Sequence, residues 1–154
     1  MPLHRLFVPK GLYSPEERDA LAAAITDLYT SPPLSLPAFY VVVLFIELDA
    51  ANIFVGRNIH EKMLRIAVER VTQNFTDNAQ KRQFMDIYEK ALAPFTTGCG
   101  LDWEIQVVDC DRLLWNINGM VSPEFKSAEE RLWKRENRAV TREEIEALRA
   151  AGQL

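Results

Sequence analysis

Residues that build metal centres and disulfide frameworks are scarce in this sequence. Its 154 residues include two cysteines, Cys99 and Cys110, and two histidines, His4 and His60. There is no CxxC pair and no HExxH motif, so we expect no metal site. Two separate cysteines in a chain of this length favour free thiols over a disulfide framework, which we interpret as typical of a cytoplasmic protein.

The sequence also has no long apolar segment and no excess of basic residues. Its most apolar stretch, 38–48, is about half as long as a membrane-spanning helix must be, and the polar N-terminus does not resemble a signal peptide. The net charge of −4 gives no electrostatic support for binding a polyanion. We therefore expect neither a membrane nor a nucleic acid as partner, and local arginines would have to hold any anionic substrate.

What the sequence does contain is an ordinary globular composition and a first strand–helix–strand unit. Hydrophobic residues make up 48% of the chain, enough for one domain over 1–154 to bury its own core. Residues 3–8 have strand composition, and Ser14–Glu17 form a capping box that opens a helix. Residues 38–47 are apolar without alternation, which predicts a strand buried on both faces. Residues 52–55, before a glycine, predict a hairpin arm.

A second unit of similar length follows the first. Residues 64–71 alternate as a strand, Thr76 and Asp77 provide a helix cap, and 103–108 read as the returning strand. Because β-α-β connections are right-handed, two such units favour an α+β fold with a four-stranded mixed sheet and two helices on one face. We place the two halves at about 2–58 and 63–110.

The remaining residues, 111–154, differ in kind and form a C-terminal helical extension. Two further capping boxes, Ser127–Glu130 and Thr141–Glu144, each predict the start of a short helix. A few apolar residues, including Leu132 and Trp133, give the first of these helices a face that can pack.

Proline at position 2 is the residue with the clearest chemical meaning. Removal of the initiator methionine would leave Pro2 as a secondary amine at the start of a strand. A typical α-amino group has a pKa of about 7.7–8.0, and an apolar pocket beside cations lowers that pKa. A neutral amine near pH 7 can abstract a proton beside a carbonyl group. The alternative is that Met-Pro reflects efficient processing only.

Several blocks together resemble a known family. The segments MPLHRLFVPKGLYSPEERDALAAAITDLYT, LPAFYVVVLFIEL and FVGRN, and later LDWEIQVVD, LLWNINGMVSP and ERLWKRENRAV, are similar to the cis-3-chloroacrylic acid dehalogenase-like branch of the tautomerase superfamily. Within that branch they most resemble fungal proteins of the oxalocrotonate tautomerase type. The resemblance implies a double β-α-β fold, a homotrimer, an N-terminal proline that acts as the base, and no cofactor.

Some residues of the dehalogenase have counterparts here and some do not. Its histidine late in the first helix is replaced by Tyr29, which could donate a hydrogen bond to substrate or simply pack in the core. Its two carboxylate-binding arginines align with Val71 and Asn74, so Arg70, one position away, is the best candidate for the anion clamp. The alternative for Arg70 is a solvated charge at a strand end, and Arg57 is a weaker candidate.

The glutamate with which the dehalogenase activates water aligns with a segment that has no carboxylate, Trp115–Asn118. Asn116 and Asn118 could orient a carbonyl or a water but cannot take a proton from it. Trp115 could form an apolar wall beside the amine or pack in the core. This segment therefore disfavours hydration and dehalogenation, whereas simple tautomerisation needs only one base.

The expected function is proton transfer on a small α-keto or enol carboxylic acid. Pro2 would move the proton, Arg70 would hold the carboxylate, and Tyr29 or Asn118 would polarise the carbonyl. Two alternatives stay open. One is another reaction on the same scaffold, such as hydration, dehalogenation or decarboxylation, and the other is a non-catalytic trimeric protein.

Overall fold

A mixed four-stranded sheet forms the centre of the molecule. The computed structural model describes residues 1–71 and 74–154. The strands lie in the order β2-β1-β5-β6, with β1 at Pro2–Pro9, β2 at Val42–Leu48, β5 at Met63–Arg70 and β6 at Asp102–Asp109. β1 runs parallel to β2 and antiparallel to β5, and β5 runs parallel to β6. Two parallel pairs joined in antiparallel fashion are what two β-α-β units produce, so the predicted fold is confirmed.

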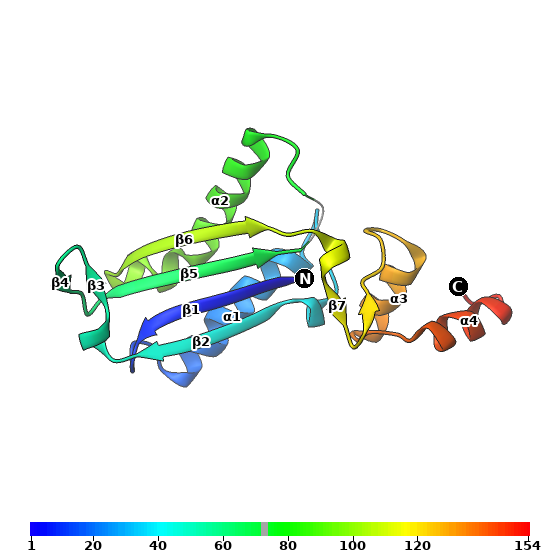
Figure 1. The fold of residues 1–154 in the computed structure, drawn as a ribbon, viewed down its shortest axis with the longest axis horizontal. Helices are drawn as coiled ribbons and strands as arrows, with labels where there is room; N and C mark the ends of the chain where they lie inside the picture. The colour runs from blue at the N-terminus through cyan, green and yellow to red at the C-terminus, as the bar shows by residue number, and fades with distance from the viewer. Residues whose placement is uncertain (72–73) are drawn as a thin grey trace.

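Two helices cover one face of this sheet (Figure 1). They are α1, Pro15–Thr30, and α2, Asn78–Leu92. Alternate residues of β1 and β5 point to the helices and are buried, whereas the residues between them are half-exposed. The core therefore lies between the helices and this face, and its fully buried side chains include Leu6, Leu21, Ile25, Leu64, Ile66, Tyr88 and Leu92.

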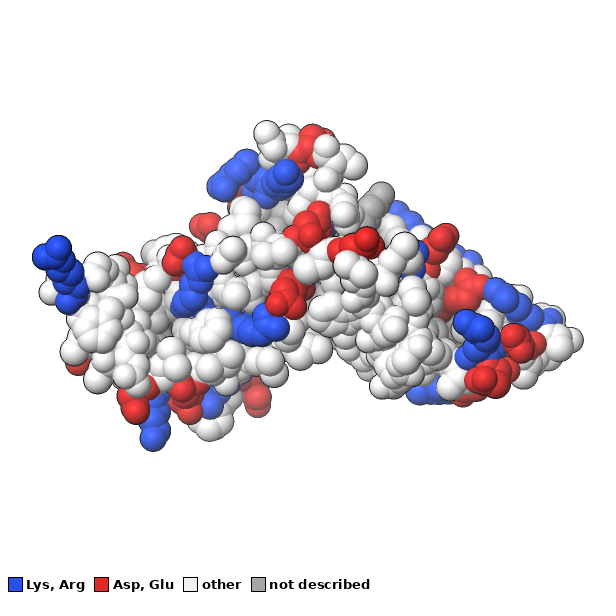
Figure 2. All heavy atoms as spheres, in the orientation of Figure 1, with Lys and Arg blue, Asp and Glu red and all other residues white. Residues whose placement is uncertain are grey.

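The second face of the sheet is not covered by any element among the described residues (Figure 1). It carries side-chain ion pairs from Arg5 to Glu69 and from Arg65 to Glu104, each at 2.5 Å. In Figure 2, acidic and basic groups are interspersed on the side of the molecule turned to the viewer. Mixed signs of this kind do not form a broad basic surface.

The second strand differs from its prediction in two ways. Residues Ala38–Tyr40 form a 3-10 turn, η1, in which the Val41 N–H donates to the Ala38 carbonyl at 3.0 Å, and the strand starts only at Val42. The prediction that it is buried on both faces is wrong, because none of its residues is buried in the single chain. β2 is an edge strand, so only one neighbour and one helix layer shield it.

The hairpin and the tail complete the chain. The predicted arm is present as β3, Phe54–Val55, paired with β4, Asn58–Ile59, around Gly56, whose φ of 64° suits glycine. The extension contains a further hairpin of β7, Asn116–Ile117, and β8, Met120–Val121, which the sequence did not indicate. Its two helices are α3, Ala128–Glu136, and α4, Arg142–Ala150. The short 3-10 turns are η2 Ala50–Asn52, η3 Ala93–Phe95, η4 Thr97–Cys99 and η5 Arg112–Leu114.

The helix starts follow the capping signals in the sequence. Ser14, Asp77, Ser127 and Thr141 each accept a hydrogen bond from a backbone N–H in the first turn of their helix. In the described parts of the chain, no helix is both long enough and apolar enough to cross a bilayer.

Candidate active site

A cavity of about 430 Å³ opens at the end of the sheet where the chain begins. In Figure 1 the N-terminus lies at this end, beside β7 and the extension. The cavity is lined by Met1, Leu36, Tyr40, Val71, Asn74, Asp111, Arg112, Ser122, Pro123, Glu124, Phe125 and Glu130. Its wall therefore combines the start of β1, the segment after β5 and the extension.

Pairing between β1 and β5 holds the chain start at this cavity. Pro2 lies opposite Arg70 in the antiparallel register, and the Val71 N–H donates to the Met1 carbonyl at 3.0 Å. The Met1 amine donates in turn to the Val71 carbonyl. Burial lowers the pKa of this amine to about 5, and the Arg70 cation adds to the effect, although Glu130 and Cys110 oppose it. An amine with this pKa is neutral at pH 7.

Arg70 is buried beside the amine but faces a neighbouring cavity. Its Nη1 donates to Asp109 Oδ1 at 2.9 Å, and its guanidinium lies 3.9 Å from the centre of the Phe75 ring. It lines a cavity of about 360 Å³ between the C-terminal end of α1 and the start of α2. Its Nε has no hydrogen-bond partner in the described residues. Arg70 is thus a fixed cation beside the amine.

Arg112 is among the ionisable residues of the cavity wall that were not singled out from the sequence, and Glu130 is another. Arg112, in η5, donates from Nη1 to the Ser122 carbonyl at 2.7 Å and is half-exposed at the cavity. Glu130, in the first turn of α3, is 8% exposed. The sequence signal at Glu130 was its capping box, which accounts for a helix start and says nothing about what the helix start faces. Arg112 had no motif around it that could have identified it.

Tyr29 lies in the core beside the site rather than in the cavity wall. Its side chain is fully buried, and its ring contacts the His4 ring edge-on at 5.4 Å between centroids. Burial raises the pKa of Tyr29 above its ordinary value. His4 Nδ1 lies 2.8 Å from the Tyr88 hydroxyl, and burial lowers the pKa of His4 to about 3. Both residues therefore stay neutral near pH 7.

The other predicted site residues are dispersed. Arg57 is exposed in the β3–β4 turn, at the end of the sheet opposite the chain start (Figure 1). Trp115 is half-exposed and Asn116 is exposed, and neither lines the cavity at Met1. Asn118 has a φ of 50° in the β7–β8 turn. Pro2, Arg70 and Tyr29 lie close together in the structure. The other four predicted residues lie elsewhere: Arg57, Trp115, Asn116 and Asn118.

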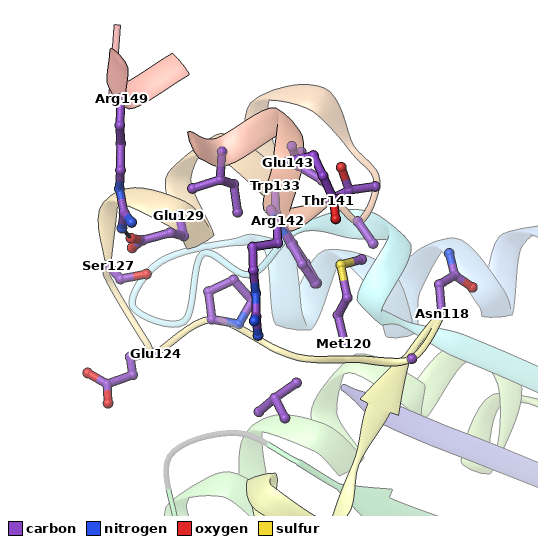
Figure 3. A pocket seen from close by; sticks show the side chains of 16 residues that line it. Asn118, Met120, Glu124, Ser127, Glu129, Trp133, Thr141, Arg142, Glu143 and Arg149 are labelled. Atoms are coloured by element: carbon purple, nitrogen blue, oxygen red, sulfur yellow. Dashed lines mark hydrogen bonds and ion pairs between the residues drawn. The ribbon is translucent and has the colours of Figure 1, made fainter. Parts of the chain in front are cut away.

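Asn118 lines a different and larger cavity, of about 890 Å³, between the β7–β8 hairpin and helices α3 and α4. Figure 3 shows Trp133 and Met120 among its wall residues, with Thr141, Arg142 and Glu143 at the start of α4. Arg149 and Glu129 form an ion pair at its edge. The backbone of 118–124 contributes to this cavity and, through Pro123 and Glu124, to the cavity at Met1.

Comparison with solved structures finds close relatives of the whole fold. RhCC from Rhodococcus jostii RHA1 is 32% identical, with a TM-score of 0.86 over 90% of this chain and 99% of RhCC. A probable enzyme from the thermophilic fungus Aspergillus fumigatus is 35% identical, with a TM-score of 0.84 over 92% of this chain and 97% of that one. A member of the cis-3-chloroacrylic acid dehalogenase family, N1, is 23% identical, with a TM-score of 0.67 over 87% and 96%, and shares the fold.

Comparison with curated protein sequences finds no match. Residues 1–138 match the family described as "Putative oxalocrotonate tautomerase enzyme". This match covers both β-α-β units and continues through α3, so it includes the start of β1 and all of the cavity wall at Met1. The chain therefore belongs to this family, Tautomerase_3, within the tautomerase superfamily.

Proposed function

We propose that this protein is a tautomerase that moves a proton on a small α-keto or enol carboxylic acid, with the amine of Pro2 as general base. The observation that carries the proposal is the position of the chain start at a cavity, where the pKa of the Met1 α-amine is lowered to about 5 by burial and by Arg70. Burial disfavours the charged amine and the nearby cation disfavours it further. A neutral amine in a rigid strand is a suitable base.

Loss of Met1 would bring the reactive nitrogen to the cavity. The Met1 side chain lines the cavity and packs on the core, and the nitrogen of Pro2 is an amide while Met1 is attached. Once Met1 is gone, the space it filled joins the cavity and the Pro2 nitrogen becomes a secondary amine next to that space. The amine then lies one residue further along β1, closer to the Arg70 backbone opposite Pro2.

The substrate carboxylate is best assigned to Arg112. Its guanidinium lines the same cavity as Met1, whereas the guanidinium of Arg70 lines the neighbouring one and is already paired with Asp109. Arg70 then acts as the cation that keeps the amine neutral. Tyr40 also lines this cavity, and its buried hydroxyl has no partner in the described residues, so it can donate to the substrate carbonyl in place of Tyr29.

The protein is further proposed to assemble as a homotrimer. One face of its sheet is uncovered and carries exposed apolar side chains on the edge strands, Leu44 of β2 and Val108 of β6. Exposed edges and apolar faces in small domains are commonly covered by further subunits. One solved structure with the same fold is a fused 4-OT asymmetric trimer.

The test is the rate at which phenylenolpyruvate ketonises. Protein with Met1 removed, confirmed by mass, is compared with a form that carries an extra N-terminal residue, so that the Pro2 nitrogen stays an amide. Because general-base catalysis contributes about 10²–10⁴-fold, the extended form should lose about that factor. Pro2→Ala, which leaves a primary amine, should retain part of the activity.

Equal rates in the processed and extended forms would contradict a role for Pro2. Absence of any rate above buffer would favour the two alternatives, another reaction on this scaffold or a non-catalytic trimer. Product analysis with unsaturated and keto acids would then separate hydration, dehalogenation and decarboxylation from no reaction.

A further inference from the structure

Three carboxylates border the cavity at the chain start, and they differ in environment. Asp111 and Glu124 are exposed, and Asp111 Oδ1 already accepts from the Leu113 N–H at 2.9 Å. Glu130 is 8% exposed. Its Oε2 accepts from the Lys126 N–H at 2.6 Å, which fixes the carboxyl group, while Oε1 has no hydrogen-bond partner in the described residues. Glu130 is therefore a positioned acid with one oxygen available.

A second helix of the extension starts with the same sequence pattern but gives its glutamate a different environment. Glu144 has the equivalent position in α4, where its side chain accepts from the backbone of the cap residue Thr141. The hydrogen bonds from Arg138 and Thr141 lower the pKa of Glu144 to about 2. Burial instead raises the pKa of Glu130, although the Lys126 N–H opposes the shift. The two glutamates share a sequence pattern, but only Glu144 closes a capping box, and their pKa values shift in opposite directions.

Several charged and titratable groups surround Glu130. Lys126 and Lys134 from its own segment and the chain-terminal amine from β1 favour its ionised form. Arg112 lines the same cavity. Tyr40 lines it too, and burial and the charge of Glu130 raise the pKa of its hydroxyl. Burial prevails over these cations, so the proton stays on Glu130 to a higher pH than on an ordinary glutamate.

We propose that Glu130 is the second proton-transfer group of this site and supplies the proton that the substrate carbon receives. The inference rests on the proposed function and adds an acid from α3 to the base from β1. It also supplies the cavity with a carboxylic acid, which the segment Trp115–Asn118 lacks. Because the base and the acid come from different elements, the proton can be removed at one atom and delivered at another.

The reaction step balances without a further reactant. The Pro2 nitrogen takes the enol hydroxyl proton, and the electrons of that O–H bond form the C=O bond. The electrons of the C=C bond take the proton from Glu130 Oε1, which forms the new C–H bond and leaves a carboxylate. The prolinium cation then returns one proton to that carboxylate through water, so both groups regain their starting states.

The test compares Glu130→Gln with Glu129→Gln in protein whose Met1 removal is confirmed by mass. Glutamine keeps an oxygen for the Lys126 N–H but has no acidic proton. We expect Glu130→Gln to lower kcat for phenylenolpyruvate by about 10²-fold or more, with little change in KM. The alkaline limb of the pH–rate profile should vanish, while the acid limb set by Pro2 stays. Glu129, which pairs with Arg149, is the neighbouring glutamate of the same helix, and Glu129→Gln should leave kcat unchanged.

A second readout follows the proton itself. In deuterium oxide the wild-type protein should place deuterium on one face of the product carbon, and Glu130→Gln should lose that preference, since solvent then delivers the proton. If Glu130→Gln does not fold, Glu130→Asp should keep the alkaline limb at reduced kcat, and loss of that limb would count against the proposal. Wild-type kcat with both limbs in Glu130→Gln would overturn it, as would equal losses in Glu129→Gln. Failure of the proposed function is recognised separately, by equal rates in processed and N-terminally extended protein.

Discussion

The two β-α-β units and the C-terminal extension are built in different ways. The units bury long apolar side chains between a sheet and two helices, and their inward residues alternate with a period of two. The extension has short, highly charged helices with well-formed caps and is anchored by a few buried residues, mainly Leu132, Trp133 and Val140.

Under the proposed function, the base and the residues that act with it come from these two different regions. β1 provides the amine and β5 provides the cation beside it, both on the rigid sheet. The extension provides Arg112 and Glu130, which border the cavity. A family member could therefore keep the amine and change its reaction by altering the extension alone. If the two regions are separable in this way, variants in each should fail differently.

The largest expected effect concerns the anchor of the extension. Trp133 is 1% exposed and contacts the Phe39 and Tyr40 rings at 6.0 and 6.2 Å between centroids. Trp133→Ala should lower the free energy of unfolding by about 3–5 kcal/mol in urea titrations, and activity should fall because Glu130 is on the same helix. Trp115→Ala is the control, since Trp115 is half-exposed and should cost less. Similar losses from the two variants would mean that Trp133 is not the anchor.

The next prediction compares an arginine from each region. Arg112→Met should raise KM by roughly 10–100-fold, because a hydrogen bond to a charged group contributes about 1.5–3 kcal/mol. Arg70→Met should instead move the acid limb of the pH–rate profile to higher pH, because loss of a cation raises the pKa of the amine. Steady-state kinetics across pH distinguish the two effects. A large KM change confined to Arg70→Met would mean that Arg70, and not Arg112, binds the substrate carboxylate.

The smallest expected effect belongs to the β-α-β core. Burial lowers the pKa of His4 to about 3 from an unfolded value of 6.5. Between these values the unfolded chain binds the extra proton, so stability falls as pH decreases below 6.5. Between pH 7.5 and 5.5 His4 should account for a loss of about 1.4 kcal/mol. Urea titrations of His4→Gln should lack this loss of stability at low pH. His60 is half-exposed and hydrogen-bonded to Asp102, and His60→Gln should retain the loss.

Local signals in the sequence were sufficient for most of the fold. Caps at Ser14, Ser127 and Thr141 are read from neighbouring residues, and the helix starts follow them. The second strand was placed too early because the apolar run 38–48 is continuous in composition, whereas Phe39 and Tyr40 of the 3-10 turn pack on Trp133, far along the chain.

The candidate site was less predictable for the same physical reason. The chemistry of Pro2 follows from its own position, and the register that sets Arg70 opposite it follows from strand pairing. Arg112 and Glu130 reach the cavity only because the extension packs back on the start of β1, which is a tertiary arrangement. The same sequence pattern places a glutamate in the first turn of α3 and of α4, yet only the glutamate in α3 faces the cavity.

The hydrogen bonds between Met1 and Val71 have a consequence for how the protein matures. Once β1 has paired with β5, the Met1 amine is hydrogen-bonded to the Val71 carbonyl and partly buried, which restricts access by an aminopeptidase. We therefore expect trimming of the nascent chain to be fastest before the sheet closes. Under the proposed function, a chain that folds before trimming gains activity more slowly, so the active fraction of a preparation depends on processing during synthesis.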